Sequence, residues 1–248
     1  MNPSNPNLHI SRIETLWTVV GQAHRDEGDV AAAQRALLER YGGAARRYLL
    51  AATRDSDAAD DLFQEFAVRF LHGRLRGAAP ERGRFRDFLK GVLSHMVADH
   101  CKKANKRPLP LSPDHPEPAA PHSPSEQDEA FLASWRDELL SRSWSALQAA
   151  EKESGQPYFT VLRFRADHPD DSSQEMAGKL SEVLGKAVTA AGVRQILHRA
   201  RERFADFLLD EIAQALHEPT DEAVEMELIE LGLLDYCGPA LQRRSDMT

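Results

Sequence analysis

Apolar residues recur every three or four positions along most of the chain, which is the spacing of one face of an α-helix. Few segments alternate with the period of two that a half-buried strand would have, and Gly or Pro separates the apolar stretches. The pattern therefore predicts an all-α fold. The expected helices cover residues 11–24, 29–53, 57–75, 84–103, 125–150, 157–166, 173–184, 190–216 and 221–231.

Local signals support several of these helices. Three starts carry the signature of an N-terminal cap, which is a Ser or Asp followed three residues later by an acid: Ser172 with Glu175, Asp57 with Asp60, and Ser125 with Asp128. Gly42 and Gly43 lie inside the helix expected over 29–53. Because glycine disfavours a helix interior, we expect a weak point there.

A proline-rich segment divides the chain. Seven of the fourteen prolines fall between Pro108 and Pro124, where almost no large apolar residue occurs, which is typical of a semi-stiff linker. With 248 residues the chain can form two cores. We expect two helical domains joined by this linker. The predicted parts are an N-terminal extension (1–28), a first domain (29–106), the linker (107–124), a second domain (125–212) and a C-terminal extension (213–248).

Charge is unevenly distributed along the chain. The formal net charge of -8 excludes a binder of nucleic acid that is basic over its whole surface. Yet eight basic residues and only two acids lie between Arg82 and Arg107, whereas residues 206–235 contain ten acids and no Lys or Arg. This asymmetry favours one anionic partner beside neutral or basic ones, with solvated helix faces as the alternative.

Cysteine content and hydropathy indicate the cellular compartment in which the protein is expected. Cys101 and Cys237 cannot build a disulfide framework, and their separation does not suggest a metal site. The start MNPSNPNLHIS lacks a basic region and an apolar core, and no uncharged apolar run approaches the roughly 18 residues of a membrane span. We expect a cytoplasmic protein with no membrane partner, no metal and no cofactor.

The helix expected over 190–216 is both basic and amphipathic. One side carries Val193, Ile196, Leu197, Ala200, Phe204 and Leu208. The other side carries Arg194, Gln195, His198, Arg199 and Arg201. A capped helix, a glycine and a short connection precede it, in SSQEMAGKLSEVLGKAVTAAG, which predicts a helix-turn-helix with donors for the DNA major groove. The alternative is a core helix with a solvated basic face.

A second basic helix is expected after the loop at 76–83. Its inward side carries Phe85, Phe88, Leu89, Val92, Leu93 and Met96. Its flanks carry Arg84, Arg86, Lys90, Lys102 and Lys103. Basic residues among aromatics beside a loop suit an unpaired nucleic-acid strand, although a core role is favoured for Phe85 and Phe88.

The stretch DDLFQEFAVRFL at 60–71 permits two interpretations. Its carboxylates, with two residues from the next helix, could belong to a metal-dependent phosphohydrolase that uses Asp60, Asp61, Glu65, His95 and Asp99. The same residues also fit a helix with an acidic N-terminus and a buried apolar face of Leu62, Phe66 and Phe70. No histidine-aspartate dyad or second pair of histidines at helical spacing occurs elsewhere, so a metal would lack ligands.

Three segments follow one another along the chain: DAADDLFQEFAVRFL, GRFRDFLKGVLSHMVADHCKKANKR and, after the prolines, SQEMAGKL with GVRQILHRARERFADFL. Taken in this order, they resemble a bacterial RNA polymerase sigma factor of the extracytoplasmic-function type. The resemblance covers residues 30–105 and 130–212. LWTVV, RGRFRDFL and LHRARERFADFLLDE are most similar to the divergent members of planctomycete-like bacteria. The resemblance implies a protein that directs promoter-specific transcription initiation and is not an enzyme.

The resemblance also implies residue roles. The helix matching Asp60 to Leu71 would dock on the clamp helices of core RNA polymerase, without metal, through Asp61, Gln64, Glu65 and Arg69. The basic helix expected over 84–103 would capture the non-template strand of the minus-ten element in promoter DNA with Arg84, Arg86, Lys90, Lys102 and Lys103. The helix-turn-helix would bind the minus-thirty-five element with Arg194, Gln195, His198, Arg199 and Arg201.

The chain departs from the family pattern in three places. Ser94-His95 stands where many members have Arg-Asn, and the turn between Leu180 and Gly192 is longer. Residues 213–248 and about the first 25 residues exceed a minimal member. In that extension we expect an amphipathic helix that completes a core, meets the polymerase or screens the basic helix with its acids. A helix-turn-helix regulator that acts without polymerase is the main rival function. An anti-sigma factor or a regulatory kinase is left open as a further partner.

Overall fold

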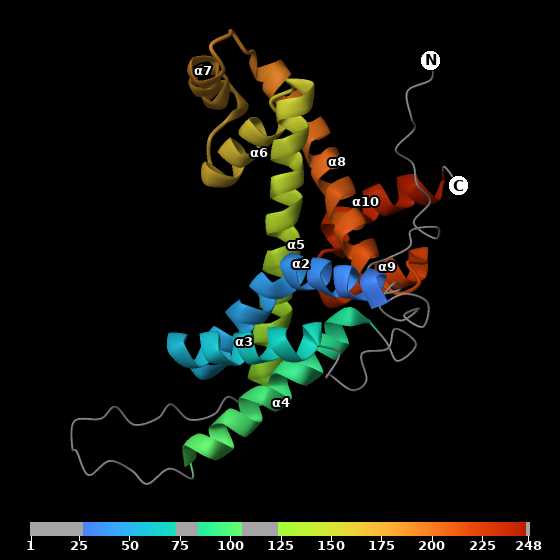
Figure 1. Ribbon diagram of the computed structural model, residues 1–248. Helices are drawn as coiled ribbons and strands as arrows, with labels where there is room; N and C mark the ends of the chain where they lie inside the picture. Colours follow the sequence, from blue (N-terminus) through green and yellow to red (C-terminus); the bar gives the residue numbers. More distant parts are fainter. Residues whose placement is uncertain (1–26, 73–83, 106–123, 247–248) are drawn as a thin grey trace, which may run out of the picture. The chain divides into compact units, whose positions relative to one another are not determined.

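A computed structural model describes residues 27–72, 84–105 and 124–246, and every regular element in these ranges is an α-helix (Figure 1). The all-α prediction is confirmed. The helices are α2 (Glu27–Thr53), α3 (Ser56–Leu71), α4 (Phe85–Asn105), α5 (Pro124–Ser154), α6 (Tyr158–Asp167), α7 (Ser173–Leu184), α8 (Ala190–Ala215), α9 (Asp221–Glu230) and α10 (Leu234–Ser245). None of them is long and apolar enough to cross a membrane. The helix expected over 11–24, the loop at 76–83 and most of the proline-rich segment lie outside the described residues.

The chain forms two compact units. The first contains the described residues up to Glu138 together with Ala213–Ala223, and the second contains Leu139–Ile212 with the described residues from Val224 onward. The divisions fall inside α5, α8 and α9, so each of these helices contributes to both units. These packing units do not coincide with the predicted domain bounds, and the two units are described separately below.

The first unit is built on α2, α3, α4 and the beginning of α5. Its core is aromatic and contains the buried residues Tyr41, Tyr48, Phe66, Phe70, Phe85, Phe131 and Trp135. Tyr41 stacks on Trp135 with ring centroids 4.6 Å apart. The expectation that Leu62, Phe66 and Phe70 are buried along α3 is confirmed.

Two glycines in the middle of α2 allow close packing. The helix runs unbroken through Gly42 and Gly43, so the weak point expected there is wrong. A Cβ added at Gly42 would lie 3.1 Å from the Phe63 ring, and one at Gly43 would lie 2.4 Å from the Glu138 carboxylate. That carboxylate accepts a hydrogen bond of 2.7 Å from Arg47 on the same helix. The glycines therefore admit side chains from α3 and α5.

Two of the three predicted helix caps differ from the structure. Asp55 caps α3, because its carboxylate accepts hydrogen bonds from the backbone N–H of Asp57 (2.9 Å) and Ala58 (3.1 Å). The cap expected at Asp57 is therefore two residues too late. Ser125 lies inside α5, which begins at Pro124, a residue suited to the first helical position because it lacks an N–H.

The second unit packs the later part of α5 against α6 and α8. Trp144 is central: its ring meets the edge of Phe159 at 5.9 Å and the ring of Phe204 at 4.8 Å between centroids. Glu151 fixes the start of α6 by accepting hydrogen bonds from the backbone N–H (2.8 Å) and hydroxyl (2.5 Å) of Thr160.

The C-terminal extension forms two helices, of which the sequence pattern predicted only the first. The apolar positions at helical spacing in this extension are Val224, Leu228, Leu231 and Leu234, with Ile229. Val224 and Leu228 of α9 and Leu231 directly after it are buried, Leu234 is half-buried, and Ile229 is 51 % exposed. Helix α10 was not expected, because it contains Gly238 and Pro239. It forms nonetheless, with Cys237, Ala240 and Leu241 buried, since burial outweighs weak local propensity. Burial also raises the pKa of the Cys237 thiol to about 12.

Candidate nucleic-acid interface

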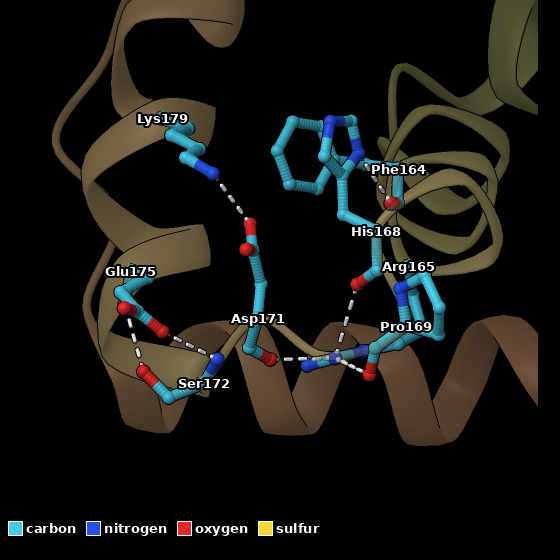
Figure 2. A network of polar contacts seen from close by, with 8 residues as sticks. All are labelled: Phe164, Arg165, His168, Pro169, Asp171, Ser172, Glu175 and Lys179. Atoms are coloured by element: carbon cyan, nitrogen blue, oxygen red, sulfur yellow. Dashed lines mark hydrogen bonds and ion pairs between the residues drawn. The ribbon is translucent and has the colours of Figure 1, made fainter.

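The connection between α6 and α7 is held by one arginine (Figure 2). The Arg165 guanidinium donates hydrogen bonds to the backbone carbonyl oxygens of His168 (3.4 Å), Pro169 (3.0 Å) and Asp171 (2.6 Å). The His168 ring stacks on Phe164 at 4.3 Å between centroids. These contacts fix the direction in which the chain enters α7.

Helix α7 begins with the predicted capping box. The Glu175 N–H donates to the Ser172 hydroxyl (3.2 Å), and the Ser172 N–H donates to the Glu175 carboxylate (2.7 Å). This prediction is confirmed. Hydrogen bonding to Ser172 lowers the pKa of Glu175, and the ammonium of Lys179, 2.8 Å away, lowers the pKa of Asp171 (Figure 2). Both carboxylates are thus held in the charged form at the helix start, where they are favourable.

The turn between α7 and α8 is closed by side chains of its own. Gly185 ends α7 with a positive φ of 63°, a conformation that favours glycine. The Ser181 hydroxyl accepts a hydrogen bond from the Val188 N–H (2.9 Å), and the Thr189 hydroxyl accepts one from the Gly192 N–H (3.1 Å). The connection is therefore ordered by specific bonds although it is longer than a minimal turn.

The first half of α8 presents one polar face. All five residues predicted for it are exposed: Arg194, Gln195, His198, Arg199 and Arg201. On the opposite side Val193, Leu197 and Ala200 are buried and Ile196 is half-buried, which confirms the predicted apolar stripe. Among the described residues, Arg194 and Arg199 form no ion pair. Their guanidinium groups are available to a ligand.

The basic residues at the start of α4 differ from expectation. Arg86 is buried, with its guanidinium 3.5 Å from the Asp87 carboxylate. Arg84 donates a hydrogen bond of 2.9 Å to the same carboxylate. The expectation that Arg86 lies on the surface is wrong, because its side chain is part of the packing of the first unit.

Further along α4 the basic residues become more accessible. Lys90 is half-buried and forms an ion pair of 2.8 Å with Asp128 of α5. Lys102 and Lys103 are exposed at the end of the helix, and Lys102 lies 3.8 Å from Asp99. Of the five basic residues predicted on this segment, these last two are the most open to solvent.

One face of α3 is exposed and mixed in character. The four residues predicted for it, Asp61, Gln64, Glu65 and Arg69, are all exposed. Glu65 and Arg69 pair with each other across one helical turn. Val68 and Leu71, which are 52 % and 38 % exposed, share this side of the helix. We call Asp61, Gln64, Glu65, Val68 and Leu71 the α3 stripe.

The carboxylates proposed for a metal site do not gather in the structure. Asp60 is engaged by Arg46, which donates hydrogen bonds of 2.6 and 3.1 Å to its two oxygens and lowers its pKa. Within the described part of the chain, no three His, Cys, Asp or Glu side chains are grouped so that they could hold a metal ion. Asp60 acts instead as a link between α2 and α3.

No protein-family model, curated protein or solved structure matches the chain. An assignment of function therefore depends on the surfaces described above.

Two arginines that the sequence pattern did not single out join the α8 face. Arg203 of α8 and Arg243 of α10 line an open hollow together with Arg199. The spacing of Arg199 and Arg203, four residues apart on one helix, is a signal that could have identified the first. No sequence pattern predicts that Arg243 lies beside Arg199, because the position of Arg243 depends on how α10 packs.

Proposed function

We propose that the chain is a bacterial sigma factor, which binds core RNA polymerase in the cytoplasm and directs it to promoters. The observation that carries the proposal is the exposed face of α8 with Arg194, Gln195 and Arg199, preceded by a capped helix and a closed five-residue connection. In a helix-turn-helix, such a face enters the major groove, where Arg recognises guanine and Gln recognises adenine. This face would bind the minus-thirty-five element.

The α3 stripe supports a protein partner rather than DNA. Its carboxylates, Asp61 and Glu65, would repel a phosphate backbone, whereas the exposed Val68 and Leu71 offer the apolar area found at the centre of protein interfaces. A chain with one face for DNA and another for a protein fits a factor that brings polymerase to DNA. The sequence resemblance to sigma factors names the same face for docking.

The minus-ten function has weaker support on α4. Since Arg86 is buried and Lys90 is paired with Asp128, we assign contacts with the melted strand to Lys102 and Lys103. The segment 73–83 lies outside the described residues, so the loop predicted beside this surface remains a prediction.

A helix-turn-helix regulator that acts without polymerase is the second candidate. It would use the same face of α8, and the closed turn between Ser181 and Thr189 supports it equally. It gives no role to the α3 stripe, however. Binding to core polymerase therefore distinguishes the two functions.

The test inverts the charges of α3 while keeping its internal ion pair. Glu65→Lys combined with Arg69→Glu retains an attractive pair one turn apart, so the free energy of unfolding should change by less than about 0.5 kcal/mol. We expect the double variant to lose co-purification with core RNA polymerase and to lose promoter-dependent transcription in vitro. Circular dichroism and thermal unfolding check that the fold is retained.

A matched control exists on α6, where Arg163 and Asp167 form an exposed pair of the same spacing at 3.2 Å. Arg163→Asp combined with Asp167→Arg should leave polymerase binding intact. If the α3 double variant still binds core polymerase, the docking assignment is wrong. If the unmodified protein binds DNA but never binds polymerase, the regulator is the correct function.

A further inference from the structure

Helix α10 of the C-terminal extension packs along the second half of α8, within the second unit. The Tyr236 ring meets the edge of Phe204 at 6.0 Å between centroids. Arg244 donates hydrogen bonds to the Asp210 carboxylate (2.8 Å) and to the Asp206 carbonyl oxygen (2.7 Å). These contacts fix α10 to the helix that carries the exposed arginines.

This packing forms an open hollow of about 300 Å³ beside the α8 face. It is lined by Tyr158, Arg199, Glu202, Arg203, Asp206 and Arg243. Three arginine side chains from α8 and α10, two distant parts of the sequence, therefore line it. We call Arg199, Arg203 and Arg243 the arginine triad.

Two carboxylates also line the hollow, but both have cationic neighbours. Glu202 lies 3.5 Å from the Arg243 guanidinium and 3.8 Å from the His198 ring. Asp206 lies 3.6 Å from Arg244, which is outside the lining. The lining holds three arginines and two carboxylates, so it has an excess of positive charge even with Arg243 paired to Glu202. Arg199 has no carboxylate partner among the described residues.

An arginine cluster of this kind suits an oxyanion. The planar guanidinium presents donors in a fork that matches phosphate oxygens, and it remains charged at any pH of interest. Arg199 and Arg203 continue the exposed face from Arg194 by steps of about one helical turn and end at the hollow. When a recognition helix lies in the major groove, its flanking residues meet the phosphates at the groove edge.

We propose that the arginine triad binds one phosphate group of a nucleic-acid backbone, so that α10 supplies a DNA contact through Arg243. The site rests on the proposed DNA-binding role of α8. It gives the C-terminal extension a positive part in binding, because Arg243 adds charge to the face while Arg244 neutralises acids beside it.

The experiment measures the binding of the full-length protein to a short random-sequence DNA duplex at several KCl concentrations. Neutralising one phosphate contributes about 0.9 to the slope of log K against log salt concentration, so losing one of the three arginines that bind it should reduce the slope by up to about that amount. We expect this reduction in Arg243→Gln, with weaker binding to every sequence. Arg243→Lys keeps a positive charge and should retain the slope of the unmodified protein. Arg35→Ala, an exposed charge on α2, is the control of matched net charge and should also retain it.

Three further outcomes are decisive. An unchanged slope in Arg243→Gln, together with a reduced slope in Arg194→Ala, would overturn the triad and leave the role of α8 intact. A second outcome combines an unchanged slope in Arg243→Gln with an effect of inorganic phosphate, measured at equal ionic strength, that stabilises the unmodified protein but not Arg243→Gln. It would show that the triad binds a free oxyanion and would overturn the proposal that it binds a phosphate of the nucleic-acid backbone. A reduced slope in a protein that does not bind core polymerase would support the triad and overturn the sigma assignment.

Discussion

At Gly43 of α2, an added side-chain atom would meet the side chain of Glu138 from α5. Replacing a glycine in a helix interior with alanine stabilises by about 1 kcal/mol when there is room. At Gly43 the new Cβ would meet the Glu138 carboxylate at 2.4 Å, so that side chain must move and release Arg47. We therefore expect Gly43→Ala to stabilise less than Gly91→Ala, since Gly91 has no atom within 4 Å of an added Cβ. Chemical denaturation measures both.

The cause can be isolated by removing the obstructing carboxylate. In a Glu138→Ala background the Gly43→Ala substitution no longer displaces a side chain, and it should recover the full gain of about 1 kcal/mol. Equal effects of Gly43→Ala in the two backgrounds would mean that the close approach carries no energetic cost.

The burial of single residues shows which parts of the candidate site could be predicted from the sequence. The exposed side of α8 and the buried Leu62, Phe66 and Phe70 of α3 follow from the helical period, because a regular helix sorts residues by spacing alone. Arg86 does not follow the pattern, since its burial depends on the packing of the first unit. The helical period predicts the side of a helix on which a residue lies, but not whether a neighbouring element covers that side.

At the scale of helices, the predictions succeeded where local chemistry determines the boundary. The capping box at Ser172 and Glu175 involves two residues three positions apart, so the sequence contains all of its information. Helix α10 has no such local signal, and Gly238 with Pro239 argues against it. It is stabilised by contacts with residues more than thirty positions away, such as Arg244 with Asp206 and Asp210, which no local pattern can indicate.

The capping box predicts a pH-dependent contribution to the stability of α7. Ser172→Ala should destabilise the helix start by about 1 kcal/mol at neutral pH. Because hydrogen bonding to Ser172 lowers the pKa of Glu175 in the folded chain, its carboxylate stabilises the fold above its ordinary pKa. That contribution is lost as the pH falls through the lowered value. The difference between Ser172→Ala and the unmodified protein should therefore shrink in acid.

Amide hydrogen exchange along α7 measures this effect directly. The control is Ser145→Ala, which removes a hydroxyl that donates to a carbonyl within α5 (3.1 Å) and caps nothing. The assigned role of the capping box would be contradicted if Ser172→Ala left the amide protection of α7 unchanged. It would also be contradicted if the difference in protection between the two proteins grew in acid.

For the whole molecule, the sequence predicted the helical class, whereas the predicted domain bounds stay a prediction and the packing units divide the chain inside helices. The proline-rich segment suggested a boundary near residue 124, yet the first part of α5 packs in the first unit through Phe131 and Trp135. The arginine triad was equally out of reach, because it joins α8 to a helix that the sequence pattern does not predict. Both depend on contacts between residues that are distant in sequence.

The C-terminal extension can complete a core or screen the basic face of α8, and the structure favours the core. Leu241 is buried, and truncation of a buried leucine costs about 2–5 kcal/mol. We expect Leu241→Ala to lower the free energy of unfolding by that order, as measured by thermal and chemical denaturation. The screening idea concerns instead the exposed acids of α9, such as Glu222 and Glu225.

Neutralising those acids separates the two roles without disturbing the packing. Because neither Glu222 nor Glu225 has an ion pair with a described residue, Glu222→Gln with Glu225→Gln should leave stability unchanged. If α9 does not screen α8, this variant should bind random-sequence DNA at low salt no more tightly than Glu129→Gln with Asp137→Asn, which changes the net charge equally at exposed positions of α5. Tighter DNA binding by the α9 variant alone, with cooperative unfolding preserved in Leu241→Ala, would instead establish a screen. The charge of α9 beside the basic face of α8 would then matter more than the core.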